Sequence, residues 1–448
     1  MSTWAEQSLH GWGHYPVHGA LVARPESPAE VAQALREHQG RGLLAYGLGR
    51  SYGDAPLLEG GQVLRTERLD RMLSFDDSTG WARIEAGVTV EDLARTFAPR
   101  GWFPPVVPGT WYVTAAGALA NDIHGKNHHL DGTWADHVRR VELLTASGEV
   151  VVCDAEREPD LFWATVGGLG LTGLILSMEV RMVPIPGPYI EVETVKVRDL
   201  DHFFQVSAES GGYSHTVSWI DTTTRGRGMG RGHFMRGRWT AERPPAGLHL
   251  PRLTVPFDAP NALLNRATIT LFNEAYYQRQ RAARVRAITG YEPFFFPLDA
   301  VDGWNRAYGP RGFLQYQLVV PHDPERRAIR AVMEAVTRSG MASFLAVIKE
   351  FGDRIHPHLS FPRPGVTLAM DFPNRGRPLL DLFDRLDRIV LDAGGRLYLG
   401  KDARLSRDTF RAMYPEWEGW RALRDTWDPE GVFRSSLGRR LGLCKEDR

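Results

Sequence analysis

The segment Gly109–His129, GTWYVTAAGALANDIHGKNHH, constrains this chain more than any other stretch. Its first half consists largely of small residues and carries no charge before Asp122. Small residues let the backbone approach a bulky planar ligand closely, and they leave N–H groups free to hydrogen-bond it. The second half places three histidines and a lysine within six residues. We therefore expect a binding loop, followed by a polar cluster that acts on a molecule beside the ligand.

The histidine-rich part of this loop has two other interpretations. Histidine is the commonest metal ligand, so a metal site is the first of them. The spacing of His124, His128 and His129 does not form HExxH or a comparable zinc pattern, so we expect no metal. A histidine-rich turn on the surface is the second alternative.

A second small-residue segment, GLGRSYGD, occupies Gly47–Asp54. The spacing of its glycines differs from the dinucleotide fingerprint, and no clear helix begins directly after it. Successive N–H groups in such a turn form a nest for a diphosphate, to which Ser51 adds a hydroxyl donor and Arg50 a charge or a packing contact. A plain tight turn is the alternative. Two such segments in one α/β unit favour a long cofactor between them, and we interpret it as a flavin.

The chain divides near Pro184–Pro188, where its pattern changes. Strands and helices alternate before this point, which indicates an α/β or α+β fold. Ser27-Pro28-Ala29-Glu30 is typical of a capping box that begins a helix, and a second helix is expected after Thr89. The expected strands of this half are 42–46, 62–66, 82–86, and a hairpin of 138–144 with 150–153.

Plainer strands follow in the middle of the chain. In Phe313–Val320 one face carries Gln315 and Gln317, which suits a wall that hydrogen-bonds a hydroxylated ligand, although a solvated face of an antiparallel sheet would look the same. Similar strands are expected at 343–349 and 366–372, and a strand ending in Lys401 precedes helical segments. Arg225–Arg238, with five arginines and five glycines, predicts a mobile loop or hairpin. RNA binding, or contact with a phosphate or a membrane surface, is its alternative.

Composition excludes several classes of protein. Lys+Arg and Asp+Glu are equal at 54 each in 448 residues, so no global field attracts nucleic acid or an anionic membrane. The two cysteines, Cys153 and Cys444, lack metal-ligand spacing and are typical of a reducing compartment. No signal-peptide pattern and no apolar stretch of membrane-spanning length is present. We expect a soluble, cytoplasmic monomer.

Seven segments together resemble one family. In order, they are GLGRSYGD, PGTWYVTAAGALANDIHGKNHH, ELLTASGEV, LFWATVGGLGLTG, WNRAYGPRGFLQYQ, LSFPRPG and GGRLYLGKDAR. They are similar to the decaprenylphosphoryl-β-D-ribose 2′-oxidase group of the vanillyl-alcohol-oxidase-type flavoproteins. The resemblance implies an α+β, PCMH-type fold with FAD as cofactor. Its FAD-binding domain would span residues 1–190, completed by 397–448, and an antiparallel-sheet substrate domain would span 191–396.

The resemblance also implies which residues contact FAD and which face the substrate. The implied cofactor-binding residues are Gly47, Gly49, Arg50, Ser51, Tyr52, Gly53, Gly109, Thr114, Ala115, Ala116, Gly117, Asn121, Asp122, His124, Asn127, Ile175 and Tyr398. The implied substrate-binding residues are Gly125, Lys126, Gln315, Gln317, Lys349 and Lys401. Many relatives attach the flavin covalently through a histidine in the first glycine loop, where this chain has Arg50. No cysteine lies in Gly109–His129, so we expect non-covalent FAD.

The chemistry implied is oxidation of a sugar hydroxyl to a carbonyl by hydride transfer to flavin N5. We assign proton acceptance to Lys401 first and to His124 second. A lysine acts as a base only if burial or a nearby positive charge lowers its pKa. Otherwise Lys401 stabilises developing negative charge, or it merely forms a salt bridge with Asp402. Oxygen or another acceptor would reoxidise the flavin.

The expected substrate is a soluble sugar, amino sugar or polyol. The mycobacterial group has a cysteine where this chain has Ala369, an asparagine near Thr367, and an aromatic hydroxyl near Phe295. A lipid-linked ribose of cell-wall arabinan synthesis is the alternative substrate. Two other classes were weighed: a flavin-free binding protein that keeps the fold, and a nucleic-acid-binding protein that uses Arg225–Arg238, although we expect no nucleic-acid partner.

Overall fold

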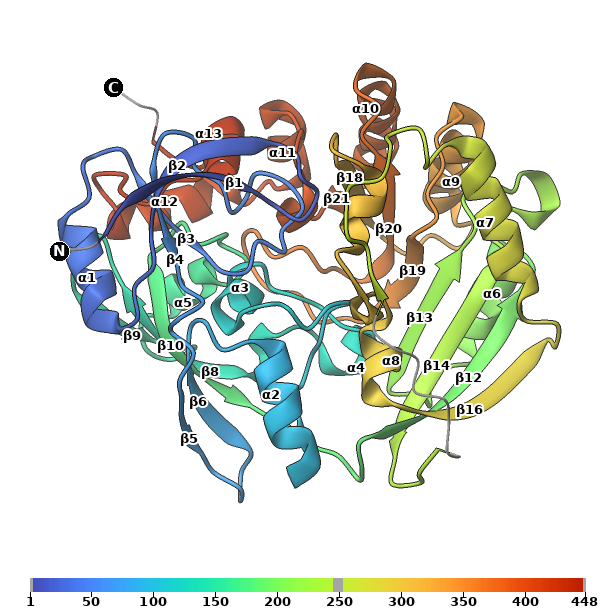
Figure 1. Cartoon of the computed structure of the whole chain (residues 1–448), viewed down its shortest axis with the longest axis horizontal. Coiled ribbons are helices and arrows are strands. Elements are labelled where there is room, and N and C mark those ends of the chain that lie inside the picture. Colours follow the sequence, from blue (N-terminus) through green and yellow to red (C-terminus); the bar gives the residue numbers. More distant parts are fainter. Residues whose placement is uncertain (1–2, 245–252, 446–448) are drawn as a thin grey trace.

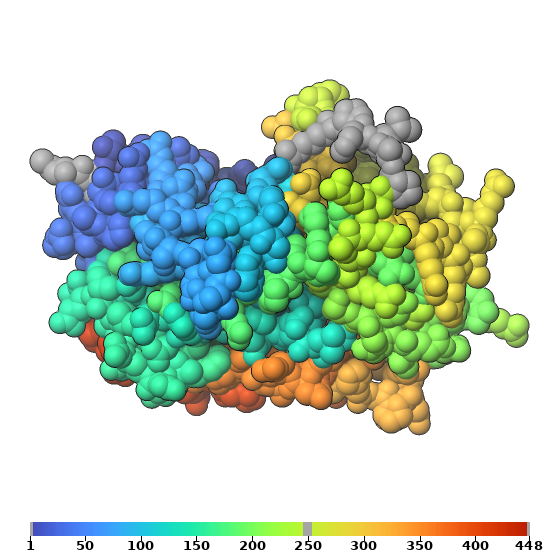
Figure 2. Space-filling view, turned by 90° about the horizontal axis from the view of Figure 1, so that it is seen from below, coloured from blue at the N-terminus to red at the C-terminus, as the bar shows by residue number. Residues whose placement is uncertain are grey.

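The computed structural model describes residues 3–244 and 253–445, and its fold is α+β. A four-stranded sheet, a five-stranded sheet and an eight-stranded sheet form its framework (Figure 1). The N-terminal strands and the C-terminal helices lie together on one side, and the eight-stranded sheet lies on the other. Figure 2 shows the two parts side by side, with the orange and red C-terminal residues along one edge beneath both.

The four-stranded sheet leads into the first glycine-rich segment. Its strand order is β1-β2-β4-β3, with β2, β4 and β3 parallel. Helix α1, Pro28–Arg36, connects β2 to β3, and the predicted cap is confirmed because Ser27 accepts a hydrogen bond from the N–H of Glu30. The strands are β1 Ala5–His10, β2 Val17–Ala23, β3 Leu43–Tyr46 and β4 Gln62–Arg65.

The five-stranded sheet, in the order β5-β6-β10-β8-β9, is antiparallel. Its β8–β9 pair confirms the predicted hairpin. Thr89 and Asp92 form a capping box at the start of α2. The strands are β5 Met72–Phe75, β6 Trp81–Glu85, β8 Val138–Leu144, β9 Val150–Cys153 and β10 Leu174–Arg181. The helices of this part are α2 Val90–Phe97, α3 Ala115–Ala120, α4 His128–Asp131 and α5 Pro159–Thr165.

The eight-stranded sheet is antiparallel throughout, in the order β16-β12-β14-β13-β19-β20-β18-β21. Its strands are β12 Tyr189–Val197, β13 His215–Ile220, β14 Gly232–Thr240, β16 Arg284–Gly290, β18 Phe313–Val320, β19 Ala346–Phe351, β20 Gly365–Pro373 and β21 Arg396–Leu397. The accompanying helices are α6 Leu200–Ala208, α7 Arg266–Gln278, α8 Tyr291–Phe295, α9 Arg327–Ser339 and α10 Arg377–Asp392. Two short ladders pair β7 Trp102–Phe103 with β11 Val183–Pro184, and β15 Leu253–Thr254 with β17 Val301–Asp302.

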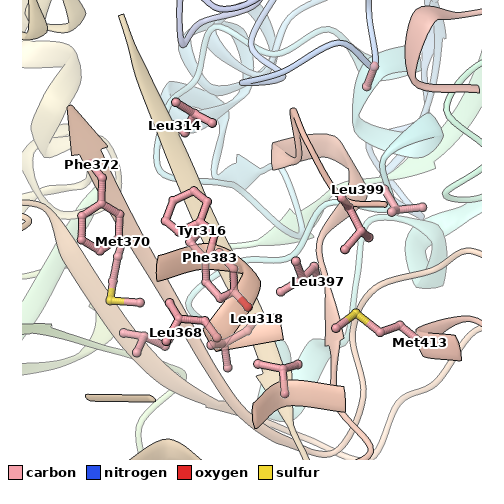
Figure 3. Packing of buried hydrophobic residues seen from close by; sticks show 14 of the residues in the cluster. Leu314, Tyr316, Leu318, Leu368, Met370, Phe372, Phe383, Leu397, Leu399 and Met413 are labelled. Atoms are coloured by element: carbon pink, nitrogen blue, oxygen red, sulfur yellow. The ribbon is translucent and has the colours of Figure 1, made fainter. Parts of the chain in front are cut away.

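Strands β18 and β20 separate the core from the ligand-facing side. Leu314, Tyr316 and Leu318 lie on one face of β18 and pack with Leu368 of β20 and Phe383 of α10 (Figure 3). Because side chains alternate along a strand, the glutamines between them point to the opposite face. Burying one face fixes the register of this part of the sheet.

The arginine-rich segment is not the mobile loop that its composition predicts, although its strand does form a hairpin with β13. Most of its second half is β14, which lies inside the eight-stranded sheet between β12 and β13. Three of its five arginines are paired with carboxylates: Arg231 with Asp221 and Glu274, Arg236 with Glu193, and Arg238 with Glu191. These carboxylates compete with the phosphates that an RNA or membrane surface would offer.

The C-terminal segment returns to the N-terminal half. The predicted strand ending in Lys401 is wrong: β21 ends at Leu397, and residues Leu399–Lys401 form a 3-10 turn closed by the Lys401 N–H on the Tyr398 carbonyl. Helices α11 Arg407–Met413, α12 Trp417–Trp427 and α13 Ser436–Leu441 follow. Phe433 forms a parallel bridge to Leu43.

Both cysteines are buried and unpaired. In the part of the chain that the structure describes, no helix is long and apolar enough to cross a membrane.

Candidate active site

A cavity of about 340 Å³ lies where both glycine-rich segments meet the eight-stranded sheet. Loops from the N-terminal half form one side of it, and β18, β19 and β20 form another. Residues Tyr398, Gly400 and Lys401, which follow β21, complete its lining. The cavity therefore depends on segments from the beginning, middle and end of the chain.

The first glycine-rich segment presents free backbone donors to this cavity. Within residues 3–244 and 253–445, no acceptor is hydrogen-bonded to the N–H groups of residues 47–51. Gly49 has φ +63°, and a Cβ there would clash with the Tyr46 hydroxyl. Arg50 packs over the ring of Trp12 at 4.0 Å and donates from Nε to the Tyr112 carbonyl at 3.3 Å. A run of free N–H groups beside an arginine fits the diphosphate of FAD.

Buried polar atoms without partners mark the rest of the cofactor side. Asn121 Oδ1, His124 Nδ1 and Thr367 Oγ1 have no hydrogen-bond partner among the described residues, and all three side chains line the cavity. Buried polar groups are nearly always hydrogen-bonded, so these atoms await a polar ligand. The cavity therefore fits FAD by its donors as well as by its small residues.

His124 is neutral and points one donor at the cavity. Gln317 Nε2 lies 3.0 Å from His124 Nε2, so the amide donates and the neutral ring carries its proton on Nδ1. Burial, followed by the charge of Lys349, holds the pKa of His124 well below its usual range. Rings of Phe351, Phe361 and Tyr398 surround the imidazole.

Two lysines face the same part of the cavity. Lys349 Nζ donates to the Gly125 carbonyl at 2.7 Å, and burial lowers the pKa of Lys349 to about 7. Lys401 Nζ lies 3.9 Å from the centre of the Tyr52 ring. Burial lowers the pKa of Lys401 to about 8, although the carboxyl of Asp371 opposes this shift. Both amines can therefore exchange protons near neutral pH.

The structure brings most of the predicted site residues together around the cavity. Those that line it are Gly47, Gly49, Arg50, Ser51, Tyr52, Gly109, Thr114, Ala116, Gly117, Asn121, His124, Ile175, Gln315, Gln317, Lys349, Tyr398 and Lys401. Thr114 also accepts a hydrogen bond from the Gly117 N–H, which orders the second segment.

Three predicted cofactor contacts lie outside the lining because they support the loops from behind. Gly53 packs against the backbone of Asp402, where a Cβ would clash. Ala115 is fully buried, and its N–H bonds the Val88 carbonyl. Asp122 is also fully buried and accepts a hydrogen bond from the Ser360 hydroxyl at 2.5 Å.

Asn127, Gly125 and Lys126 are also outside the lining. Asn127 donates to the Pro105 carbonyl and to Asp131. The carbonyl of Gly125 is the acceptor for Lys349, so Gly125 orients that lysine. Lys126 Nζ donates to the Phe295 carbonyl at 2.9 Å, and burial lowers the pKa of Lys126 to about 8.

The other two histidines of the loop are structural. His128 Nδ1 accepts a hydrogen bond from the Gly352 N–H at 3.2 Å, and His129 Nε2 donates to the Tyr213 carbonyl at 3.0 Å. Among the residues that the structure places, no group of three or more His, Cys, Asp or Glu side chains could hold a metal ion. The zinc interpretation therefore has no support in this geometry.

Sequence reasoning missed several residues at the cavity. Trp12, Asp299 and Trp304 line it but were not among the predicted site residues, although Trp304 begins the segment WNRAYGPRGFLQYQ. Asp299 accepts a hydrogen bond from the Trp111 N–H at 2.9 Å. Asp371 lies next to the lining and accepts a hydrogen bond from Gln315. The alternation of β20 places Asp371 on the same face as Thr367 and Ala369, and this signal was present in the sequence.

Comparisons with known proteins agree with this site. Residues 19–154 match a family model described as FAD binding domain, and residues 368–441 match one described as D-arabinono-1,4-lactone oxidase. Fold and matches together define an FAD-dependent oxidoreductase with a PCMH-type fold. The chain is 39% identical to decaprenylphosphoryl-beta-D-ribose oxidase of Mycolicibacterium smegmatis over 97% of both chains. It belongs to the family of that enzyme.

Two further relatives extend the comparison. An uncharacterized protein in the mprA 5′ region of Streptomyces coelicolor is 34% identical over 80% of this chain and 100% of its own length. L-gulono-1,4-lactone dehydrogenase of Mycobacterium tuberculosis is 24% identical over 94% of this chain and 96% of its own. Relatives named as oxidases and dehydrogenases thus span most of the chain.

Proposed function

We propose that this protein oxidises a hydroxyl group of a carbohydrate to a carbonyl. The observation that carries the proposal is that two lysine amines, one imidazole and the amides of two glutamines line the same cavity as the free N–H groups of residues 47–51. FAD bound in this cavity would accept the hydride that the alcohol carbon gives up. The hydrogen of the C–H bond would leave with both bonding electrons as a hydride, the O–H proton would pass to the protein, and a C=O bond would form.

Lys401 is the proposed acceptor of that proton. Its amine lines the cavity, and its lowered pKa of about 8 makes the neutral form available near neutral pH. His124 is the weaker candidate, because its Nε2 already accepts from Gln317 and its Nδ1 carries a hydrogen. In this arrangement His124 donates a hydrogen bond, and Lys349 adds positive charge near the reacting oxygen.

We propose that the protein holds its FAD without a covalent bond. A covalent attachment in the first glycine-rich segment would need a nucleophilic side chain. Arg50 occupies that position and packs against the rings of Trp12 and Tyr112. The lining within the described residues contains one histidine, His124, and no cysteine. Acid precipitation is expected to release all of the yellow colour into the supernatant, and colour retained in the pellet would refute this part.

Two substrate classes follow from these features. The glutamines and lysines of the cavity suit any hydroxylated sugar, including a soluble one. A lipid-linked sugar is favoured by a second observation: β15 pairs with the cavity-lining β17, and exposed Leu253 and Phe257 lie on and just after β15. The full-length relative from Mycolicibacterium smegmatis carries such a substrate in its name.

The test is anaerobic reduction of the bound flavin. The holoprotein is mixed with soluble aldoses, amino sugars and polyols in one series, and with polyprenylphosphoryl pentoses in detergent in another. Loss of absorbance near 450 nm identifies the substrate class, and a Lys401→Met variant should lose it much more slowly. If no sugar of either series bleaches the flavin, the proposed function is wrong.

A further inference from the structure

Asp371 is a buried carboxylate next to the cavity lining, on the same face of β20 as Thr367 and Ala369. It lies opposite Gln315 in the antiparallel register of β18 and β20 and is 0% exposed. Gln315 Nε2 donates to Asp371 Oδ1 at 2.5 Å, so one oxygen of the carboxylate is satisfied. The other oxygen, Oδ2, is buried and has no hydrogen-bond partner among the described residues.

Such a group is costly, because a buried charge without full pairing loses its hydration. The groups that face Asp371 are Gln315, the phenols of Tyr52 and Tyr308, and the amine of Lys401. Lys401 is the one cation among them. Burial raises the pKa of Asp371 to about 7, and the hydrogen bond from Gln315 and the charge of Lys401 oppose this shift.

The amine of Lys401 also has no hydrogen-bonding or ion-pair partner among the described residues. Its Nζ rests over the Tyr52 ring. The groups that face it are Tyr52, Asp371 and His124. The neighbouring Asp402 is not available to it, because that carboxylate pairs with Arg440 at 2.9 Å. One carboxylate oxygen and one amine therefore lie near the cavity without a partner.

We propose that Asp371 is a positioning residue: its buried carboxylate holds the amine of Lys401 in place at the cavity, and its bond to Gln315 fixes the amide that lines the cavity. This proposal deepens the proposed function, since it rests on Lys401 as the group that handles the substrate proton. Asp371 is absent from the cavity lining, and its hydrogen bond to Gln315, which does line the cavity, connects the carboxylate to the site.

The sign of the effect follows from the charges. The carboxylate of Asp371 raises the pKa of Lys401 against the larger effect of burial. Replacing Asp371 by asparagine keeps an acceptor for Gln315 but removes the charge, so the pKa of Lys401 falls. An opposite charge beside an ionisable amine changes its pKa by about one or more. In the pH profile of flavin reduction, the part controlled by ionisation of Lys401 then moves to lower pH. This holds whether the lysine acts as a base or as a fixed cation.

The direct experiment measures the amine rather than turnover. The holoprotein and the Asp371→Asn variant are labelled with trace acetic anhydride between pH 5 and 10, and acetylation of Lys401 is read by mass spectrometry. We expect the midpoint for Lys401 to fall by about one pH unit in the variant. Asp302→Asn, which removes a carboxylate elsewhere on the cavity lining, should leave the midpoint unchanged. An unchanged or raised midpoint in Asp371→Asn overturns the proposal.

Two further measurements keep the outcome clear. If Asp371→Asn does not fold, Gln315→Leu removes the donor to Asp371 and favours its protonated form, so the Lys401 midpoint should fall in the same direction. The pH profile of flavin reduction should shift in the same direction as the acetylation midpoint of Lys401. The pH dependence that is due to Lys401 should be absent in Lys401→Met. If no sugar reduces the flavin while the labelling midpoint still moves, the proposed function fails and the link between Asp371 and Lys401 stands.

Discussion

Arg424 of α12 provides the sharpest test of how the C-terminal segment is attached. Both Arg424 and Asp428 are 0% exposed, and they pair at 2.8 Å. Arg424 also donates to the carbonyls of Leu171 and Phe433. Arg424→Ala leaves Asp428 buried without its counter-charge, which costs about 3–5 kcal/mol. Because Asp428 keeps the N–H groups of Val432 and Phe433 as donors, we expect the lower half of this range.

The assay is thermal unfolding of the holoprotein, followed by both protein and flavin fluorescence. A loss of about 3 kcal/mol corresponds to a fall in Tm of about 3 °C, because the entropy of unfolding grows with chain length. Arg421→Ala is the matched control, since Arg421 is partly exposed on the same helix and its pair with Asp425 is 3.8 Å long. Such a pair is worth about 0–1 kcal/mol.

The same variant tests whether this segment supports the cofactor. Leu171, whose carbonyl Arg424 holds, follows the cavity-lining Leu169 and Gly170. We therefore expect Arg424→Ala to weaken FAD retention during gel filtration, with no such loss in Arg421→Ala. Equal Tm values for the two variants would refute the electrostatic argument. A lowered Tm with unchanged retention of FAD would refute the coupling to the cavity.

The remaining predictions concern FAD binding, proton transfer by Lys401 and the stability of the protein at low pH. Gly49→Ala should lose FAD, because its Cβ would meet the Tyr46 hydroxyl, whereas Gly60→Ala, with a similar φ of +65° and open space, should keep its 450 nm band; equal FAD content would contradict this. Lys401→Met should slow flavin reduction by about 10²–10⁴-fold with the 450 nm band intact, and a wild-type rate would exclude Lys401 from proton transfer. Burial lowers the pKa of His215 to about 3 from an ordinary 6.5, so the unfolded chain binds more protons between these values and stability falls as the pH drops below about 6.5. His215→Phe should reduce the difference between the urea unfolding midpoints at pH 7 and pH 5. An unchanged difference would show that other groups cause the loss of stability at acid pH.

Local signals in the sequence predicted the elements and the loops well. The cap at Ser27, the capping box at Thr89 and the hairpin of β8 with β9 depend on short-range chemistry, which the sequence contains. The two small-residue segments meet at one cavity, as their composition predicts. For the cap, the capping box and the hairpin, the deciding interaction lies within a few residues of the motif.

Long-range pairing explains what the sequence did not reveal. Arg225–Arg238 looks like a flexible basic tract until Glu191, Glu193 and Asp221 are brought beside it by the sheet. Lys126 looks like a substrate contact until the Phe295 carbonyl is placed at its amine. Asp371 was not predicted as a site residue because its role depends on Gln315, which is 56 residues away in sequence and directly opposite on the neighbouring strand. A single sequence does not state which strands are neighbours.

The two-sided character of β18 has a consequence for altering this protein. Leu314, Tyr316 and Leu318 secure the strand from the core, while Gln315 and Gln317 carry none of that packing. A library that varies only Gln317 and its cross-strand neighbour Ala369 should therefore change which sugars are accepted while most of its members still fold, whereas Gln315 is kept as the donor to the buried Asp371. Selection could explore new substrates here without first repairing the scaffold.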